Sequence, residues 1–420
     1  IFLIILAIVS YLLGKEIKVK IFLVLFSSFF GLYLAEGILT FDLIFSKDKY
    51  EKFQQNRNIR LKNDIKTKLQ IYEDLKREGS KVILYVAPAS FISDSDQEIL
   101  PLSSMANTKT ILGNENGYNP IYQSDRYGFN NPDEEWDKKQ IEFLLVGDSF
   151  TQGLGVNEPD TIAGNLRRLL NTKSGVLNFG HGSNGPLIEY ATLREYMPLM
   201  KTKKVLWLYY EQNDLSNLSN ELENKILLNY LNDQHFTQNL KLKQNKIDIM
   251  VNEKFLKELN LMLDKKLLEE KPLQKMNFLH FLRLSNVRKI TLEKFFSSPN
   301  PKFKEIMNLS KEFVESNGAK IYFVYLPGYE RYDNTLILQD ASKKYNKVIK
   351  IIKNLKIPII DINKDLFKKH SDPLSLFPNR LLHYHYNELG YQLVTKTILK
   401  KIIEYEKNLP KNTKLQLLVP

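Results

Sequence analysis

The chain contains no cysteine among its 420 residues. This absence excludes disulfide bonds, zinc sites built on cysteine ligands and catalysis by a thiol. A cysteine-free protein is compatible with either side of a bacterial membrane. Cysteine usage therefore does not indicate the compartment.

A concentrated basic surface is also missing. Lys and Arg number 60 against 48 Asp and Glu, for a formal net charge of +12. The lysines are nevertheless spread over many segments and are not interleaved with aromatic residues in one patch. Lys, Asn and Ile are abundant throughout, as in proteins from AT-rich genomes. We therefore expect no nucleic-acid binding.

Long apolar runs are confined to the N-terminus. Ile21–Leu39 is long enough to cross a bilayer and is apolar on all faces, which argues against a buried core helix. No small-residue cleavage site follows it, so we expect an uncleaved anchor. Ile1–Leu13 is shorter, and because the chain begins with isoleucine we expect it to be a truncated first span. Residues 1–40 are thus predicted to be a transmembrane anchor of two spans.

The charges around these runs predict an orientation. Lys15, Lys18 and Lys20 lie between the two spans, and positive charge favours the cytoplasmic side. Everything after residue 40 is then expected outside the cytoplasm. Residues 41–80, charged and helical in pattern, are predicted to form a stalk.

Apolar strands alternate with amphipathic helices in the second half of the chain. The expected strands are Glu142–Val146, Gly175–Phe179, Lys203–Tyr210, Ala319–Tyr325 and Ile357–Ile362. The expected helices are Asp160–Leu170, Pro186–Met200, Lys302–Ser316, Ser342–Leu355 and Asn387–Glu406. This alternation predicts an α/β fold with a parallel sheet covered on both faces, in a flavodoxin-like doubly wound order.

Two segments depart from the alternation. Residues 215–301 have a helical pattern and form a predicted insertion into a domain spanning 141–410. The insertion could be a lid, a docking surface or a decoration without chemistry. Residues 81–140 begin with a strand-like run, Lys81–Pro88, and continue into turns. We expect them to be an N-terminal extension that packs on the main domain.

The most informative motif is the stretch FLLVGDSFTQGLG at residues 143–155. A buried strand that ends in Gly-Asp-Ser places Ser149 at the sheet edge where ligands bind, and the following helix start can face an anion. Ser149 is therefore a candidate nucleophile. The nucleophile elbow of α/β-hydrolases, Gly-x-Ser-x-Gly, is excluded, because it needs a glycine two residues after the serine and the residue there is Thr151. The plain alternative is an Asp-Ser turn that caps a helix.

Three further loops carry polar groups at the same predicted edge. The glycine-rich turn after the second strand contains Gly182 and Ser183, and Asn213 ends the third strand. His385 precedes the last helix, with His383 as a competitor. Each has a plain alternative: a strand-to-helix connection, an Asx turn or a solvated loop histidine.

In this order the motifs resemble those of the SGNH (GDSL-type) hydrolases. Gly147-Asp148-Ser149 is similar to block I, the turn after Asn178 to block II, Asn213-Asp214 to block III, and the His385-x-Asn-x-x-Gly-Tyr run to block V. The resemblance implies Ser149 as nucleophile and His385 as base. It implies an oxyanion hole from the Ser149 N–H, Gly182 or Ser183, and Asn213. Asp148 and Asp214 are expected to give structural support.

The chain departs from this pattern at three places. Ser183 stands where the family has a donor glycine, and Glu211 replaces the glycine of block III. The usual aspartate before the block V histidine is missing, since those positions are Leu382 and His383. A distant carboxylate such as Asp372, a backbone carbonyl or no acid at all could take its place.

The resemblance implies a membrane-anchored serine esterase that acts through an acyl-enzyme on Ser149. An envelope location favours O-acetyl esters of a carbohydrate as substrate, with no metal and no organic cofactor. The alternatives are an O-acyltransferase supplied by a membrane acyl-donor protein and a catalytically inactive scaffold. A peripheral binder of anionic lipid, using the lysine-rich insertion, is a further alternative.

Overall fold

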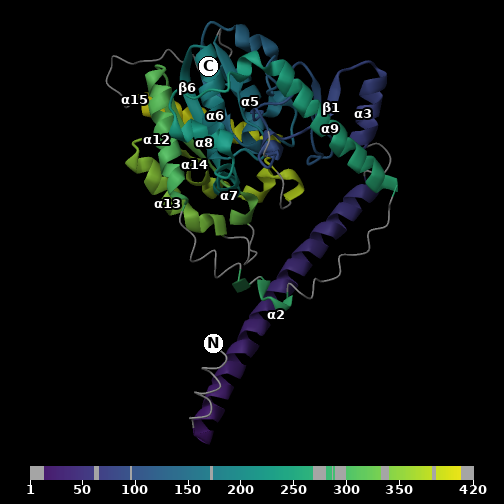
Figure 1. The fold of residues 1–420 in the computed structure, drawn as a ribbon, viewed down its shortest axis with the longest axis vertical. Helices are drawn as coiled ribbons and strands as arrows, with labels where there is room; N and C mark the ends of the chain where they lie inside the picture. Colours follow the sequence, from purple (N-terminus) through teal and green to yellow (C-terminus); the bar gives the residue numbers. More distant parts are fainter. Residues whose placement is uncertain are drawn as a thin grey trace. The chain divides into compact units, whose positions relative to one another are not determined.

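The computed structural model describes residues 14–60, 66–94, 97–170, 174–267, 281–285, 287–288, 299–332, 340–380 and 385–407. The chain divides into two compact units (Figure 1). The helical unit comprises 1–57, 269–297 and 335–337, and the sheet unit comprises 58–268, 298–334 and 338–420.

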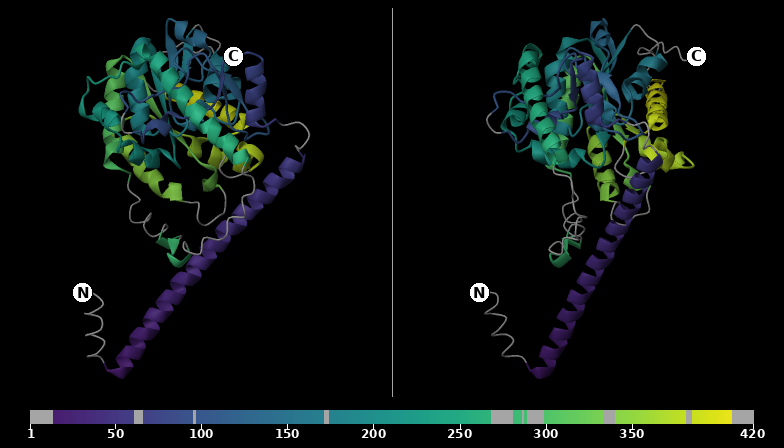
Figure 2. Two further views of the ribbon diagram at one scale, coloured as in Figure 1. Left: turned by 45° about the vertical axis from the view of Figure 1, so that its right-hand side comes forward. Right: turned by 90° about the vertical axis from the view of Figure 1, so that its right-hand side faces the viewer.

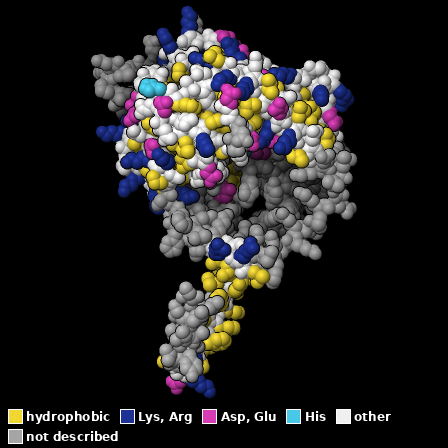
Figure 3. Space-filling model, viewed as in Figure 1, with side chains coloured by type: hydrophobic (Ala, Val, Ile, Leu, Met, Phe, Trp, Pro, Cys, Tyr) yellow, Lys and Arg dark blue, Asp and Glu magenta, His cyan; other side chains and the backbone are white. Residues whose placement is uncertain are grey.

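The helical unit is built on one long helix, α2 (Lys15–Arg60). Its Lys15–Thr40 part is long and apolar enough to cross a membrane, and Figure 3 shows apolar side chains along it. The predicted second span, Ile21–Leu39, lies within this part. The predicted first span, Ile1–Leu13, lies outside the described residues.

The one acidic residue of the predicted second span is paired inside this unit. Glu36 is buried and accepts a hydrogen bond of 2.8 Å from the Val287 N–H. One turn earlier, the Tyr33 hydroxyl donates to the Leu282 carbonyl at 3.0 Å. A short piece of the insertion thus lies against α2, and its hydrogen bond offsets part of the cost of burying a carboxylate on an apolar helix.

The sheet unit is organised around five parallel strands. These are β4 (Ile141–Gly147), β5 (Gly175–Asn178), β6 (Thr202–Tyr210), β7 (Lys320–Leu326) and β8 (Ile359–Asp361). Their order in space is β5-β4-β6-β7-β8, with every neighbouring pair parallel. In chain order this is 2-1-3-4-5, so the predicted flavodoxin-like topology is confirmed.

Helices cover both faces of this sheet. One face carries α6 (Pro186–Tyr196), α12 (Pro301–Ser316) and α13 (Asp340–Asn354), and the other carries α5 (Ile162–Leu170) and α15 (Glu388–Lys407). Leu144 and Val146 of β4 pack on the first face, and Phe143 and Leu145 on the second. Because both faces are buried, residues 143–146 of β4 form a continuous apolar run.

The insertion is helical where it is described. It contains α7 (Asp214–Glu221), α8 (Lys225–Asn232) and α9 (Gln244–Leu267). The residues of α9 that enter the core are four apart, namely Ile247, Val251, Phe255 and Leu259. This spacing gives one apolar stripe, which packs on the same side of the sheet as α6. Figure 2 (right) shows α9 and α15 on opposite sides of the sheet unit.

The extension forms a small sheet of its own. It contains α3 (Lys68–Arg77), β1 (Val82–Leu84), β2 (Lys109–Ile111) and β3 (Ile121–Gln123). β1 pairs parallel with β2, and β2 pairs antiparallel with β3. The predicted strand Lys81–Pro88 is shortened to β1, because the chain turns into a 3-10 helix at Pro88.

The stalk expected over residues 41–80 is corrected in its second half. Helix α2 continues to Arg60, but α3 belongs to the sheet unit. Tyr72 of α3 is buried, with its ring centroid 5.4 Å from that of Phe255. Burying an aromatic ring in the core outweighs keeping this amphipathic helix in solvent.

Candidate active site

The candidate nucleophile stands on a sharp turn between a strand and a helix. β4 ends at Gly147, and α4 (Ser149–Gln152) begins after Asp148. A Cβ at Gly147 would lie 2.1 Å from Thr151 Oγ1, so only glycine fits this position. Asp148 caps α4 by accepting a 2.9 Å hydrogen bond from the Phe150 N–H. Ser149 is 7% exposed at the carboxyl edge of the sheet.

His385 lies directly beside this serine. Its Nε2 is 2.8 Å from Ser149 Oγ. The imidazole packs on Phe150, with ring centroids 4.6 Å apart. The neighbouring Tyr386 hydroxyl donates to the Pro327 carbonyl at 2.6 Å and fixes the loop before α15. The fold therefore brings together two groups that are distant in the sequence.

The remaining histidines have other surroundings. His181 is fully buried, His370 is half-buried and His235 is exposed. His280 and the competitor His383 lie outside the described residues. Among the described histidines, only His385 is hydrogen-bonded to Ser149.

A carboxylate that sequence reasoning missed stands behind the imidazole. His385 Nδ1 is 2.8 Å from Glu115 Oε1 and 3.0 Å from Oε2. The His385 backbone N–H also donates to Oε2, at 2.8 Å. Asp372, the substitute considered from the sequence, instead accepts two hydrogen bonds of 2.6 Å from Arg380. Of the alternatives left open by the sequence, the structure has a distant carboxylate at His385, and that carboxylate is Glu115 and not Asp372, which is bound by Arg380.

The Glu115 loop is tied to the elements that carry the other two groups. Asn116 Nδ2 donates to the Gly155 carbonyl, just after the nucleophile turn, at 2.8 Å. The Tyr118 hydroxyl donates to Glu388 Oε1, in the first turn of α15, at 2.7 Å. Nothing in the spacing of Glu115 relative to His385 indicates this pairing. The only local sign is a carboxylate within a polar, turn-rich run.

The pair of His385 and Glu115 is electrostatically matched. Burial alone would lower the pKa of His385, but the charge and hydrogen bond of Glu115 outweigh burial and raise that pKa above 6.5. Burial acts to raise the pKa of Glu115, but His385 and the charge of Lys68 outweigh it and lower that pKa. Glu115 is therefore ionised at neutral pH and favours the protonated imidazole.

The two aspartates expected to give support are buried beside the site. Ser149 Oγ is 3.2 Å from Asp148 Oδ2, farther than from the His385 nitrogen. Burial raises the pKa of Asp148, while His385 and the Phe150 N–H oppose that rise. Asp214 accepts from the Tyr210 N–H at 2.9 Å, and burial raises its pKa strongly. Both carboxylates hold a turn through a backbone N–H.

The two candidate donors in the glycine-rich turn differ in availability. The Gly182 N–H already donates to the Tyr85 hydroxyl at 2.7 Å and to Gln152 Oε1 at 2.9 Å. Ser183 has φ +66°, in the left-handed region that costs a residue with a Cβ about 1–2 kcal/mol. Among the described residues, no acceptor takes the Ser183 N–H. The loop therefore leaves Ser183, and not Gly182, free to donate to a ligand.

Asn213 has the properties of a side-chain donor at the same edge. It occupies the N-cap position of α7, but its side chain makes no capping hydrogen bond. Its side chain acts to lower the pKa of Asp148, next to Ser149, against the rise caused by burial. Its Oδ1 is buried without a partner among the described residues. The side chain is thus held at the site without being needed for the helix.

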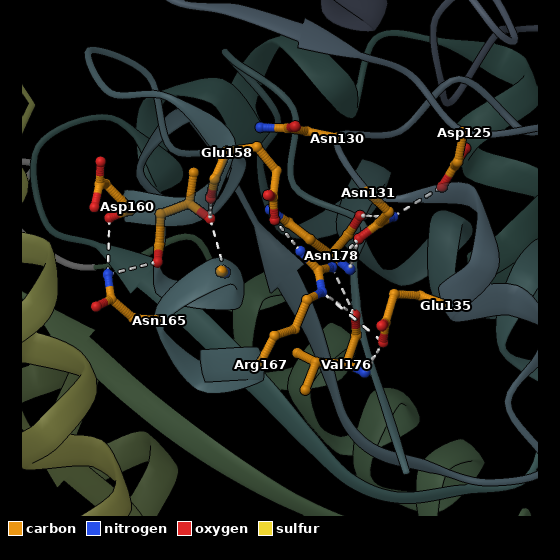
Figure 4. Close-up of polar contacts among 12 residues, drawn as sticks. Asp125, Asn130, Asn131, Glu135, Glu158, Asp160, Asn165, Arg167, Val176 and Asn178 are labelled. Atoms are coloured by element: carbon orange, nitrogen blue, oxygen red, sulfur yellow. Dashed lines mark hydrogen bonds and ion pairs between the residues drawn. The ribbon is translucent and has the colours of Figure 1, made fainter. Parts of the chain in front are cut away.

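Asn178, in the segment similar to block II, contacts Asn131 of the extension (Figure 4) and also the nucleophile turn. Its Nδ2 donates to the Thr151 carbonyl at 2.7 Å, and its N–H donates to Asn131 Oδ1 at 2.8 Å. Arg167 donates to the same Asn131 oxygen at 2.6 Å, and Asn131 Nδ2 donates to Asp125 at 2.8 Å. This network of buried polar groups fixes the turn that presents Ser149.

Glu211, which replaces the glycine of block III, has a structural role. Its carboxylate accepts from the Gly328 N–H at 2.8 Å and from Arg331 Nε at 3.0 Å, and also from the Tyr325 hydroxyl. These contacts join the carboxyl ends of β6 and β7. The departure from the family pattern is thus accommodated by a buried ion pair beside the site.

Within the described ranges, no group of three or more His, Asp or Glu residues is arranged to hold a metal ion. The groups at this edge are suited to nucleophilic attack by a hydroxyl, with proton transfer through an imidazole.

Comparisons with known proteins gave structural likenesses only. No protein-family model and no curated protein sequence matches the chain. One similar solved structure is a lipolytic protein of the G-D-S-L family from Desulfitobacterium hafniense, 14% identical, with a TM-score of 0.33, covering 63% of this chain and 99% of that one. A lipase/acylhydrolase from Enterococcus faecalis is 13% identical, with a TM-score of 0.35; the match covers 63% of this chain and 96% of that one. An acetyl xylan esterase is 13% identical, with a TM-score of 0.34; the match covers 62% of this chain and 100% of that one.

The resemblance to the SGNH hydrolases rests on the chain's own residues. The Gly-Asp-Ser turn, Asn178, Asn213 and His385 stand in the SGNH order along the sequence. They are borne on a sheet of order 2-1-3-4-5, and its carboxyl edge brings Ser149 and His385 into hydrogen-bond contact. With these blocks on this fold, the chain resembles the SGNH (GDSL-type) hydrolases in both motif order and sheet topology.

Proposed function

We propose that this protein is a membrane-anchored serine esterase that hydrolyses acyl esters, with O-acetyl esters of an envelope carbohydrate as its substrate class. The observation that carries the proposal is the continuous chain of contacts from Ser149 Oγ through both nitrogens of His385 to Glu115. A hydroxyl needs such a base to become nucleophilic, and the base needs a partner that fixes its tautomer. The inactive-scaffold alternative is disfavoured by this arrangement.

In the proposed reaction, Ser149 Oγ attacks the ester carbonyl and its proton passes to His385 Nε2. Glu115 remains ionised, accepts the Nδ1–H and stabilises the imidazolium. The imidazolium then protonates the leaving alkoxide, and an acyl-enzyme on Ser149 remains. Water attacks the acyl-enzyme with His385 again as base, which releases the acid and restores the serine.

The negative oxygen of the tetrahedral intermediate needs hydrogen-bond donors. We assign the Ser149 N–H, the Ser183 N–H and the Asn213 amide to this role. Gly182 was an alternative in the sequence, but its N–H is occupied by Tyr85 and Gln152. Ser183 adopts a left-handed backbone here without being glycine.

The proposal is tested by labelling the detergent-solubilised full chain with a fluorophosphonate. We expect one adduct, on Ser149, and release of acetate from an acetylated oligosaccharide by the unlabelled protein. The reason is that the probe reacts only with a serine activated by a base. Folded protein that takes up no label at Ser149 would support the scaffold alternative.

The same assay separates hydrolysis from transfer, since both pass through the acyl-enzyme. Acetate released without new acetylation of an added sugar supports the esterase. Acetyl groups that appear on the sugar, with an ester donor present, would instead support the O-acyltransferase. A membrane acyl-donor partner is required only in that second case.

Alanine at Asn213 is expected to lower kcat about 10²- to 10³-fold, the usual effect of losing one oxyanion donor. KM for the same ester should change little, because the interaction forms mainly in the transition state. The midpoint of thermal unfolding should stay near the wild-type value, since this side chain makes no helix cap. A loss of less than threefold in kcat would remove Asn213 from the oxyanion hole.

We also propose how the chain is placed in the cell. Residues 1–40 serve as the anchor in a bacterial inner membrane. The lysines between the two predicted spans keep the connection between these spans on the cytoplasmic side. Residues 141–410 then act in the periplasm, with 81–140 packed on them and 215–301 inserted. Figure 3 shows basic and acidic side chains interspersed over the visible face of the sheet unit, without a single basic patch there.

A further inference from the structure

A cavity of about 1000 Å³ opens beside the glycine-rich turn of the candidate site. One wall is the extension segment Ala87–Asp94, and the other is the turn between α7 and α8 of the insertion. Ser183, the proposed oxyanion donor, lies on its lining. We call this cavity the polar groove. It lies at the upper end of the volumes of ligand sites, about 300–1,000 Å³.

The polar groove is lined by groups that both donate and accept hydrogen bonds. Asn220 and Glu223 at the α7–α8 turn are exposed, and their side chains have no hydrogen-bond partner among the described residues; the same is true of the Ser93 hydroxyl on the opposite wall. Asn217 uses its Nδ2 to bind the Asn184 carbonyl at 3.1 Å. Amides, hydroxyls and a carboxylate at such a surface match the alternating donors and acceptors of sugar hydroxyls.

The charges on the lining disfavour a strongly charged ligand. Glu223 and Lys225 have opposite signs on one wall. On the other wall, Asp94 lies 3.4 Å from Lys254 Nζ, which compensates its charge. No excess of one sign is available to attract a polyanion. The lining is therefore suited to a neutral, hydroxyl-rich chain.

Hydrogen bonds to the extension wall, one from the opposite wall and one from α9, fix the groove in advance. Asn224 caps α8 through Oδ1, and its Nδ2 donates to the Ile92 carbonyl of the opposite wall at 3.0 Å. Lys254 Nζ donates to the Ser90 carbonyl at 2.9 Å. A site formed before the ligand arrives loses less entropy on binding.

We infer that the polar groove binds the carbohydrate portion of the substrate, as a neutral oligosaccharide whose acylated unit reaches Ser149 past Ser183. This inference rests on the proposed esterase function and specifies its substrate class. It also gives the insertion and the extension a shared role, since each supplies one wall. The groove selects the sugar chain, while Ser149 and His385 act on the ester.

The test is calorimetric binding to the full chain carrying Ser149→Ala, which cannot consume the ligand. The probes are cellotetraose, mannotetraose and tetra-N-acetylchitotetraose as neutral chains, with tetragalacturonic acid as a charged chain of equal length. We expect at least one neutral chain to bind and the uronic chain to bind more weakly. Adding Asn220→Ala should weaken that binding about fivefold, the value of one hydrogen bond. Glu223→Gln should also weaken it.

Asn229→Ala is the matched control, because Asn229 is exposed on α8 outside the groove lining. It should leave binding unchanged. Absence of binding by all neutral chains, stronger binding of the uronic chain, or equal effects of the Asn220 and Asn229 substitutions would each overturn the inference. Since this measurement needs no catalysis, failure of the esterase proposal is seen separately, as missing fluorophosphonate labelling while binding persists.

Discussion

Replacement of Ser149 by alanine, or of His385 by glutamine, is expected to lower kcat about 10⁶-fold, as for groups that act as one unit in a serine hydrolase. Ser149 Oγ and His385 Nε2 are 2.8 Å apart. The hydroxyl needs the imidazole as its base, and the imidazole has no proton to accept without the hydroxyl, so removing either group stops the same step. The double variant should consequently be no slower than either single variant. The measurement is the hydrolysis rate of an acetyl ester by the three proteins.

Glutamine is chosen at His385 because its amide can still donate to Glu115, which would otherwise keep a buried, unpaired charge. All three variants should unfold near the wild-type temperature. Losses that multiply in the double variant would mean that the two residues act independently. Such a result would contradict a shared proton-transfer step.

Glu115→Gln is expected to lower kcat by up to about 10⁴-fold, the loss seen when the corresponding carboxylate of a serine protease becomes an amide. The amide can leave the imidazole in the wrong tautomer, and it no longer stabilises the imidazolium. The fold should survive, since the substitution keeps the size of the side chain. The rate is measured on the same acetyl ester.

The pH profile gives a second readout of Glu115. The base must be neutral, so kcat/KM falls as the pH drops through the pKa of His385. That pKa is raised above 6.5 because the Glu115 charge outweighs burial. Without this charge, burial dominates and lowers the pKa, so the acid limb of kcat/KM should move to lower pH.

Asp372→Asn is the control, because it makes the same change from carboxylate to amide at a residue bound to Arg380. It should alter neither the rate nor the profile. An unmoved acid limb in the Glu115 variant, or a larger loss in the Asp372 variant, would show that Glu115 does not act on His385.

The position of Glu115 changes the interpretation of the extension. The sequence predicts residues 81–140 as a segment that packs on the main domain. The loop at Glu115 reaches the imidazole at 2.8 Å, and Asn116 and Tyr118 bind the nucleophile turn and α15. We therefore propose that the extension completes the active site, so that its removal would cost activity as well as stability.

The sequence by itself determined the features that depend on neighbouring residues. The consecutive apolar residues in β4 indicate a strand buried on both faces. Gly147 and Asp148 define the turn that follows it. The alternation of strands and helices predicts the doubly wound sheet, because a parallel sheet needs a crossover between strands. Local turn chemistry and the family resemblance point to Ser149 and His385, and the fold places these two side chains 2.8 Å apart.

Tertiary structure decided what depends on distance in space alone. A carboxylate can orient an imidazole from any part of the chain, so no spacing rule identified Glu115 in place of Asp372. Whether Gly182 or Ser183 has a free N–H depends on Tyr85 and Gln152, which approach from other segments. Likewise, α3 left the predicted stalk because Tyr72 finds a partner in the insertion. Hydrogen bonds and burial are short-ranged in space, and only the folded chain determines which groups come within that range.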